Sequence, residues 1–183
     1  MKLAYIHNVS PKSKSANLMQ VISMCNAFSE LDVKVHLILA KSNIPIEKLK
    51  KHLIKNNNLS DKVKVHYLYP KTNFKKLNKW LNYFSIKKVI LSINPDFCFV
   101  RNPLFLRKCL QLKIKTFIEV HNNRLHHGNK LLNFLLCNSI IYNQNNVFLV
   151  KIIAISQNLK NFWLKRGIKR NNIIALHDGF DLN

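Results

Sequence analysis

Residues 152–176 have the sequence IIAISQNLKNFWLKRGIKRNNIIAL, in which two short apolar runs flank a segment with apolar residues at helical spacing. The runs are Ile152–Ile155 and Ile173–Leu176, and Gly167 stands where a helix commonly ends. A strand, a helix and a second strand in this order predict a crossover unit. The two strands of such a unit lie parallel in one sheet.

The same alternation extends over the whole chain. Short apolar runs predict strands at residues 3–6, 33–39, 63–67, 97–100, 116–119, 152–155 and 173–176. Amphipathic segments predict helices at residues 18–28, 45–55, 74–93, from 103 onward, 125–143 and 157–165. The sequence therefore predicts one Rossmann-like α/β domain over residues 1–176. Its sheet is doubly wound and mostly parallel, with about seven strands and with helices on both faces.

The chain is strongly basic. Its 183 residues include 30 Lys and Arg against 8 Asp and Glu, which gives a formal net charge of +22. Because 48% of the residues are hydrophobic, the sequence excludes a disordered polycation. Two explanations of the charge stay open. The first is an AT-rich genome, whose codons favour a composition rich in Lys, Asn and Ile. The second is that the basic surface binds an anionic membrane. Nucleic acid is not expected, because the chain lacks an RNP strand, a GxxG loop and a Cys/His finger.

The sequence shows no pattern typical of a membrane-spanning helix, a signal peptide or a zinc site. Asn residues interrupt the most apolar stretch, residues 131–155, and the apolar run at the N-terminus stops at His7, too early for a signal peptide. The four cysteines have no CxxC spacing, so we expect reduced thiols and no zinc site. These features predict a cytoplasmic protein, peripheral at the inner face of the membrane if the charge attracts it there.

Polar residues follow the predicted strands at the edge where parallel sheets bind ligands. These strand-end residues are His7, Asn8, Arg101, Asn102, Glu119, His121, Asn122, Ser156, His177, Asp178 and Gly179. A further candidate is the loop at residues 10–15, because free amides before a helix attract anions. The loop lacks the GxGxxG spacing, which excludes an ordinary NAD site. Two interpretations of the loop stay open: it contacts a phosphate or a sugar through Ser13 and Ser15, or it is simply solvated.

Glu119 and His121 are the most informative of these residues. Glu119 lies in an apolar run, where an unpaired carboxylate would cost several kcal/mol, so it needs a partner such as Arg101 or a pair of backbone amides. His121 can act as a base near neutral pH. Two interpretations stay open: a structural hydrogen-bonded corner or an acid–base site. His126 and His127 are adjacent and point in different directions, so no metal site is expected.

Five segments, in order, resemble the N-terminal half of retaining GT-B glycosyltransferases of the family 4 type. They are KLAYIH at 2–7 with the Ser-rich loop, FVRNP at 99–103, FIEVHN at 117–122, AISQNLK at 154–160 and LHDGFD at 176–181. The resemblance covers essentially the whole chain. One departure is the loop at 10–16, which has Ser and Lys where relatives have glycines.

The resemblance implies the acceptor-binding half of an enzyme that moves a hexose from a nucleotide-sugar to a glycan or lipid-linked acceptor. It implies that residues 177–183 begin an interdomain linker and that the donor-binding domain is a missing partner, in cis or as a separate chain. Without that domain the chain should be inactive. The nucleotide-sugar is a co-substrate, and neither a cofactor nor a metal is expected.

The resemblance also assigns roles to residues. His121 is the candidate catalytic residue near the transferred sugar. The candidate substrate-binding residues are His7, Asn8, Ser13, Ser15, Arg101, Glu119, Asn122, Ser156, Asp178 and Gly179. The alternative function is a non-catalytic basic module that binds anionic membrane or glycan surfaces.

Overall fold

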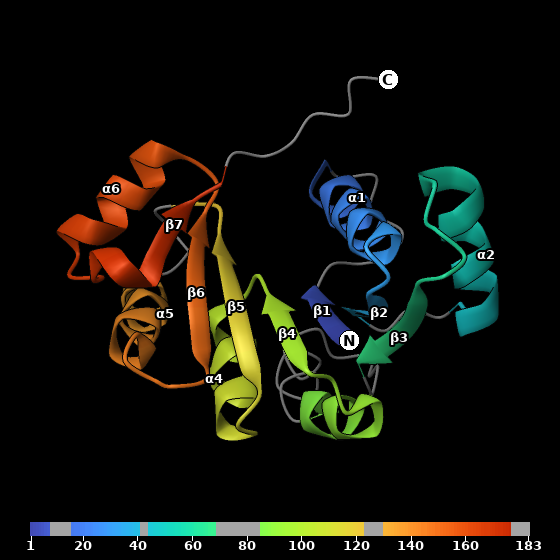
Figure 1. Ribbon diagram of the computed structural model, residues 1–183, viewed down its shortest axis with the longest axis horizontal. Coiled ribbons are helices and arrows are strands. Elements are labelled where there is room, and N and C mark those ends of the chain that lie inside the picture. Colours follow the sequence, from blue (N-terminus) through green and yellow to red (C-terminus); the bar gives the residue numbers. More distant parts are fainter. Residues whose placement is uncertain (8–15, 41–43, 69–84, 123–129, 177–183) are drawn as a thin grey trace. The chain divides into compact units, whose positions relative to one another are not determined.

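The computed structural model describes residues 1–7, 16–40, 44–68, 85–122 and 130–176 (Figure 1). The strands are β1 (Lys2–His7), β2 (Lys34–Ala40), β3 (Lys64–Leu68), β4 (Phe97–Val100), β5 (Lys115–Val120), β6 (Leu149–Ala154) and β7 (Ile173–Ala175). The helices are α1 (Ala16–Glu30), α2 (Ile46–Asn57), residues 85–93, α4 (Pro103–Gln111), α5 (Lys130–Asn143) and α6 (Gln157–Lys165), with a 3₁₀ turn at Arg170–Asn172.

All seven predicted strands are present in one sheet with the order β3-β2-β1-β4-β5-β6-β7. The pairs β1–β2, β2–β3, β5–β6 and β6–β7 are parallel. The predicted doubly wound α/β fold is therefore confirmed. Two helices are described only in part, because residues 74–84 and 125–129 of the predicted helices lie outside the described residues.

The chain divides into two compact units, residues 1–98 and 99–183, and β4 crosses the boundary between them. In the first unit, β1 is buried almost throughout, and in β2 Val35 and residues 37–39 are buried. The sequence has apolar residues at helical spacing in α1, namely Leu18, Val21, Ile22, Cys25 and Phe28. The first four are buried and Phe28 is half-buried. Burial raises the pKa of the Cys25 thiol well above its usual range, so this cysteine is an inert part of the core.

Polar contacts fix the ends of elements in the first unit. The amide of Lys2 donates to Asp96 Oδ2 at 2.7 Å, and the amide of Asp96 donates to the carbonyl of Lys2 at 3.0 Å. Asn26 on α1 donates to the carbonyl of Asn58 and accepts from the amide of Ser60. Asn58 ends α2 in the left-handed conformation, at φ 54°, which asparagine tolerates better than most residues.

In the second unit, Figure 1 shows β5, β6 and β7 side by side, in agreement with their pairing. Pro103 occupies the first turn of α4, as predicted, and the side chain of Asn102 caps that helix by accepting from the amide of Leu104. Gly167 follows α6 at φ 97°, a conformation that favours glycine and ends the helix. Trp163 on α6 is fully buried and forms part of the core.

None of the described helices combines the length and the apolar character that crossing a membrane requires.

Candidate functional site

Three polar side chains meet at the carboxyl ends of β4 and β5 in the second unit. Arg101 directly follows β4, Glu119 is the second-to-last residue of β5, and His121 directly follows β5. Neighbouring parallel strands end at the same edge of a sheet, so residues 18 to 20 positions apart in sequence come together there. The three residues are called the Arg-Glu-His cluster below.

The cluster is held by charge and by hydrogen bonds. Arg101 Nη2 lies 3.3 Å from Glu119 Oε1 and 2.8 Å from His121 Nδ1, and His121 Nε2 also contacts Glu119 Oε1. The side chains of Arg101 and Glu119 are only 4% and 5% exposed, whereas that of His121 is 23% exposed. The expected partner of Glu119 is therefore confirmed as Arg101.

Arg101 Nη2 contacts both ring nitrogens of His121, and Nε2 also contacts Glu119 Oε1. Two ionised neighbours thus orient one partly exposed imidazole. Such a group can donate to or accept from a hydroxyl once its contact with Arg101 is exchanged, and the guanidinium can then face developing negative charge.

The other predicted site residues have different positions. Ser156 caps α6 by accepting from the amide of Leu159 at 3.2 Å, so its side chain has a structural partner. His7 ends β1 and is buried, and Asn122 is exposed beside His121. Asn8, Ser13, Ser15, Asp178 and Gly179 lie outside the described residues. Among the described residues, no group of three His, Cys, Asp or Glu side chains is arranged to hold a metal ion.

The first unit contains a histidine pair that the sequence pattern does not indicate. His36 on β2 and His66 on β3 are half-buried, with near-parallel rings 5.1 Å apart, and His36 Nδ1 lies 2.9 Å from His66 Nε2. Burial is the main cause that lowers the pKa of His36, to about 4, and charge on His66, Lys64 and Lys2 acts in the same direction. Burial and then Lys64 also lower the pKa of His66.

This pair predicts a loss of stability in mild acid. The usual histidine pKa is about 6.5, so between pH 6.5 and 4 the unfolded chain binds protons that the folded chain does not. The free energy of unfolding should therefore be constant above pH 6.5 and fall as the pH falls towards 4. Solvent screens half-exposed rings, so we expect a loss of about 1 kcal/mol. Urea unfolding at a series of pH values measures it.

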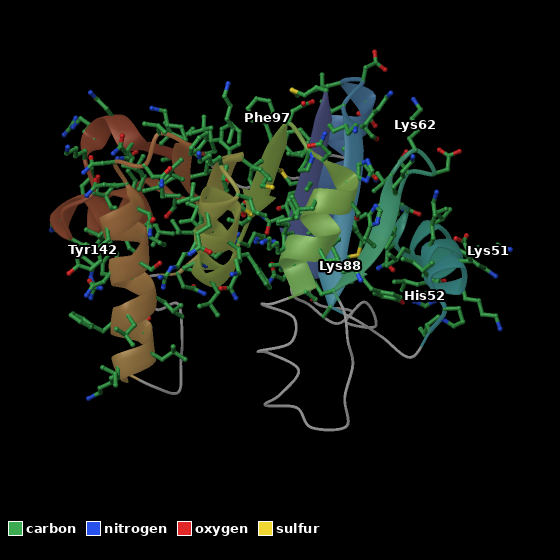
Figure 2. The ribbon with its side chains drawn as sticks, turned by 90° about the horizontal axis from the view of Figure 1, so that it is seen from below. Lys51, His52, Lys62, Lys88, Phe97 and Tyr142 are labelled. Atoms are coloured by element: carbon green, nitrogen blue, oxygen red, sulfur yellow. The ribbon has the colours of Figure 1, made fainter. Side chains whose placement is uncertain are left out.

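The matched control is His52, an exposed histidine on α2 that is hydrogen-bonded to Asn56 (Figure 2). The double variant His36→Gln/His66→Gln should flatten the pH dependence between 6.5 and 4, whereas His52→Gln should leave it as in the parent chain. Equal slopes in all three proteins would contradict this prediction.

Comparison with known proteins finds relatives by structure alone. No protein-family model matches the chain, and no curated protein matches it. The UDP-GlcNAc 2-epimerase of Methanocaldococcus jannaschii matches with a TM-score of 0.65 at 18% identity, over 96% of this chain and 45% of that one. Anabaena Alr3699/HepE in complex with UDP and glucose matches with a TM-score of 0.66 at 12% identity, over 99% of this chain and 45% of that one.

A third match is the UDP-GlcNAc 2-epimerase of Neisseria meningitidis bound to UDP-GlcNAc, with a TM-score of 0.64 at 13% identity, over 96% of this chain and 46% of that one. The chain thus spans less than half the length of each of these proteins. Identities this low show the fold alone. The chain has the fold of one half of GT-B proteins.

Proposed function

We propose that this chain is the acceptor-side, N-terminal half of a retaining GT-B glycosyltransferase of the family 4 type. The complete enzyme moves a hexose from a nucleotide-sugar to a glycan or lipid-linked acceptor. The observation that carries the proposal is the Arg-Glu-His cluster at the carboxyl ends of β4 and β5, the edge where parallel sheets bind ligands. Of the three side chains, that of His121 is the most exposed.

Two features of the matched structures support the proposal. Alr3699/HepE is in complex with UDP and glucose, and the Neisseria epimerase is bound to UDP-GlcNAc, so this fold is used by proteins that hold nucleotides and sugars. Each of those chains is more than twice as long as the part that matches. We infer that a second, donor-binding domain completes the site. Residues 1–176 form the acceptor domain, and residues 177–183 lead to that second domain.

The proposal gives each member of the cluster a role. His121 lies near the transferred sugar and assists the attack of the acceptor hydroxyl, while Arg101 stabilises negative charge that develops during transfer. Glu119 is a positioning residue, because its carboxylate is buried and orients both partners. The other candidate substrate-binding residues are His7, Asn8, Ser13, Ser15, Asn122, Ser156, Asp178 and Gly179.

Complementation tests the proposal. The chain is mixed with a candidate donor-binding domain, or fused to it after residue 183, and release of UDP or GDP from a hexose donor is measured with glycan and lipid-linked acceptors. We expect transfer only when both halves are present. The matched control carries Arg101→Met/Glu119→Leu, which removes the charges of the cluster together.

Two outcomes would contradict the proposal. The first is equal transfer by the control and the parent chain. The second is epimerisation of UDP-GlcNAc by the joined halves without any acceptor, which would place the chain with the epimerases that it resembles in fold.

A further inference from the structure

Helix α5 exposes a row of large apolar side chains. Leu131 is 67% exposed, Phe134 56%, Leu135 54% and Tyr142 81%. At 100° per residue these four positions fall within one stripe of the helix, which also contains the half-buried Asn138 and is called the α5 apolar face below. Figure 2 shows Tyr142 at the outer side of the helix.

The opposite side of α5 is apolar as well. Leu136, Cys137 and Ile140 are buried there against the second unit, which includes α4. The core therefore covers one side of this helix and leaves a second apolar side in contact with water. A helix with large apolar side chains on two opposite sides is typical of burial on both sides or of contact with lipid.

Charge is distributed around this face in an unusual way. No charged residue occurs between Lys130 and Lys151 in a chain with a net charge of +22. Lys130 is exposed at the start of α5, and near its end Lys169 Nζ donates to Asn145 Oδ1 at 3.0 Å. Cations thus lie beyond both ends of the apolar face.

Negative charge is scarce on the same unit. Among its described residues, Glu119 is the single acidic residue, and it is buried in the ion pair with Arg101. Arg107, Lys113, Lys115, Lys165, Arg166 and Arg170 are exposed. The described surface of the second unit therefore carries exposed cations and no exposed carboxylate.

We propose that the α5 apolar face binds the surface of an anionic phospholipid bilayer. Leu131, Phe134 and Leu135 enter the boundary between head groups and acyl chains, Tyr142 lies at the level of the head groups, and the flanking lysines bind lipid phosphates. Insertion of the apolar residues and attraction of the cations reinforce each other. Either contribution alone gives weak, reversible binding.

The charge also argues against two other occupants. A second copy would bring together two surfaces of the same sign, so repulsion would oppose a dimer through this face. A nucleic acid would use the cations but would gain nothing from a row of leucine and phenylalanine side chains. The inference does not depend on transferase activity, because the test below measures only binding to vesicles.

The experiment uses the full chain and two kinds of vesicle, equimolar phosphatidylcholine and phosphatidylglycerol, and phosphatidylcholine alone. Co-sedimentation gives the partition coefficient. The parent chain should bind the anionic vesicles and show little binding to the neutral ones. Phe134→Ser/Leu135→Ser should reduce binding to the anionic vesicles by ~10-fold or more, because two apolar side chains no longer leave water.

The matched control is Leu31→Ser/Leu91→Ser, since these leucines of the first unit are 74% and 56% exposed. All four changes are at exposed positions, so each variant should fold, as circular dichroism would verify. The control should bind like the parent chain. In addition, the tryptophan of Phe134→Trp should shift its emission to the blue on anionic vesicles, as expected for a ring that leaves water.

Three results would overturn the proposal. The first is equal binding by the α5 variant and the parent chain, because binding would then be explained by the attraction of the cations to anionic lipid alone. The second is the same loss of binding in the control variant. The third is a dimer in sedimentation velocity that only the α5 variant converts to a monomer, which would make the apolar face a contact between copies.

Discussion

Glu119→Gln should lower the free energy of unfolding by about 3 kcal/mol, because the guanidinium of Arg101 would then be buried without a compensating charge. The neutral amide keeps the size and shape of the glutamate, so the loss reports charge rather than a cavity. His121 would also lose the carboxylate that its ring contacts. Urea unfolding followed by circular dichroism at neutral pH measures the change.

A double-mutant cycle of Arg101→Met, Glu119→Leu and their combination separates the ion pair from packing. Arg101→Met alone should also destabilise the protein, because Glu119 then becomes an unpaired buried carboxylate. The double variant Arg101→Met/Glu119→Leu should be more stable than either variant with one charge removed, since no charge remains buried without its partner.

The matched control is Glu47, an exposed glutamate in the first turn of α2. Glu47→Gln should change stability by less than about 0.5 kcal/mol, as surface substitutions usually do. The prediction would be wrong if Glu119→Gln behaved like Glu47→Gln, or if the effects of the two cluster substitutions simply added.

Most of the fold could be predicted from local signals. Strands that are buried on both faces appear as short apolar runs, and proline and glycine mark the boundaries of helices. Pro103 predicted the start of α4, and Gly167 predicted the end of α6. These positions depend on the backbone preferences of single residues, so no long-range information was needed.

Part of the candidate site could be predicted because acidic residues are rare in this chain. A carboxylate in the apolar run of β5 must have a partner. Arg101 was a candidate for this partner because it follows β4, and the carboxyl ends of parallel strands lie at the same edge of the sheet. The sequence also placed His121 beside them. Its contacts with Arg101 and Glu119 could not be predicted, because they depend on side-chain rotamers.

Two other features depend on tertiary structure. His36 and His66 are 30 residues apart, and their contact follows from the register of β2 against β3, in which Ile38 pairs with His66. Helix α5 carries apolar residues on two opposite sides, so its periodicity could not show which of these sides the core covers. The exposed side is identified only once Leu136 and Ile140 are seen to be buried.

The last prediction concerns His121 itself. For the transferase proposed above, joined to a donor-binding domain, His121→Ala should lower kcat/KM for sugar transfer about 100-fold or more, within the usual range for a group that moves a proton in the transition state. The ion pair of Arg101 and Glu119 remains in this variant, so stability should fall by much less than in Glu119→Gln. Steady-state transfer assays and urea unfolding measure the two effects.

His121→Gln separates the two interpretations of the cluster. Glutamine can hydrogen-bond to Arg101 and Glu119 but cannot take up a proton near neutral pH, so a structural corner would be rescued by it and an acid–base group would not. We expect activity to stay near that of His121→Ala while stability returns towards the parent value. His52→Ala on α2 is the matched control and should transfer sugar at the parent rate. Recovery of activity in His121→Gln would assign His121 to the structure of the site and leave proton transfer to another group.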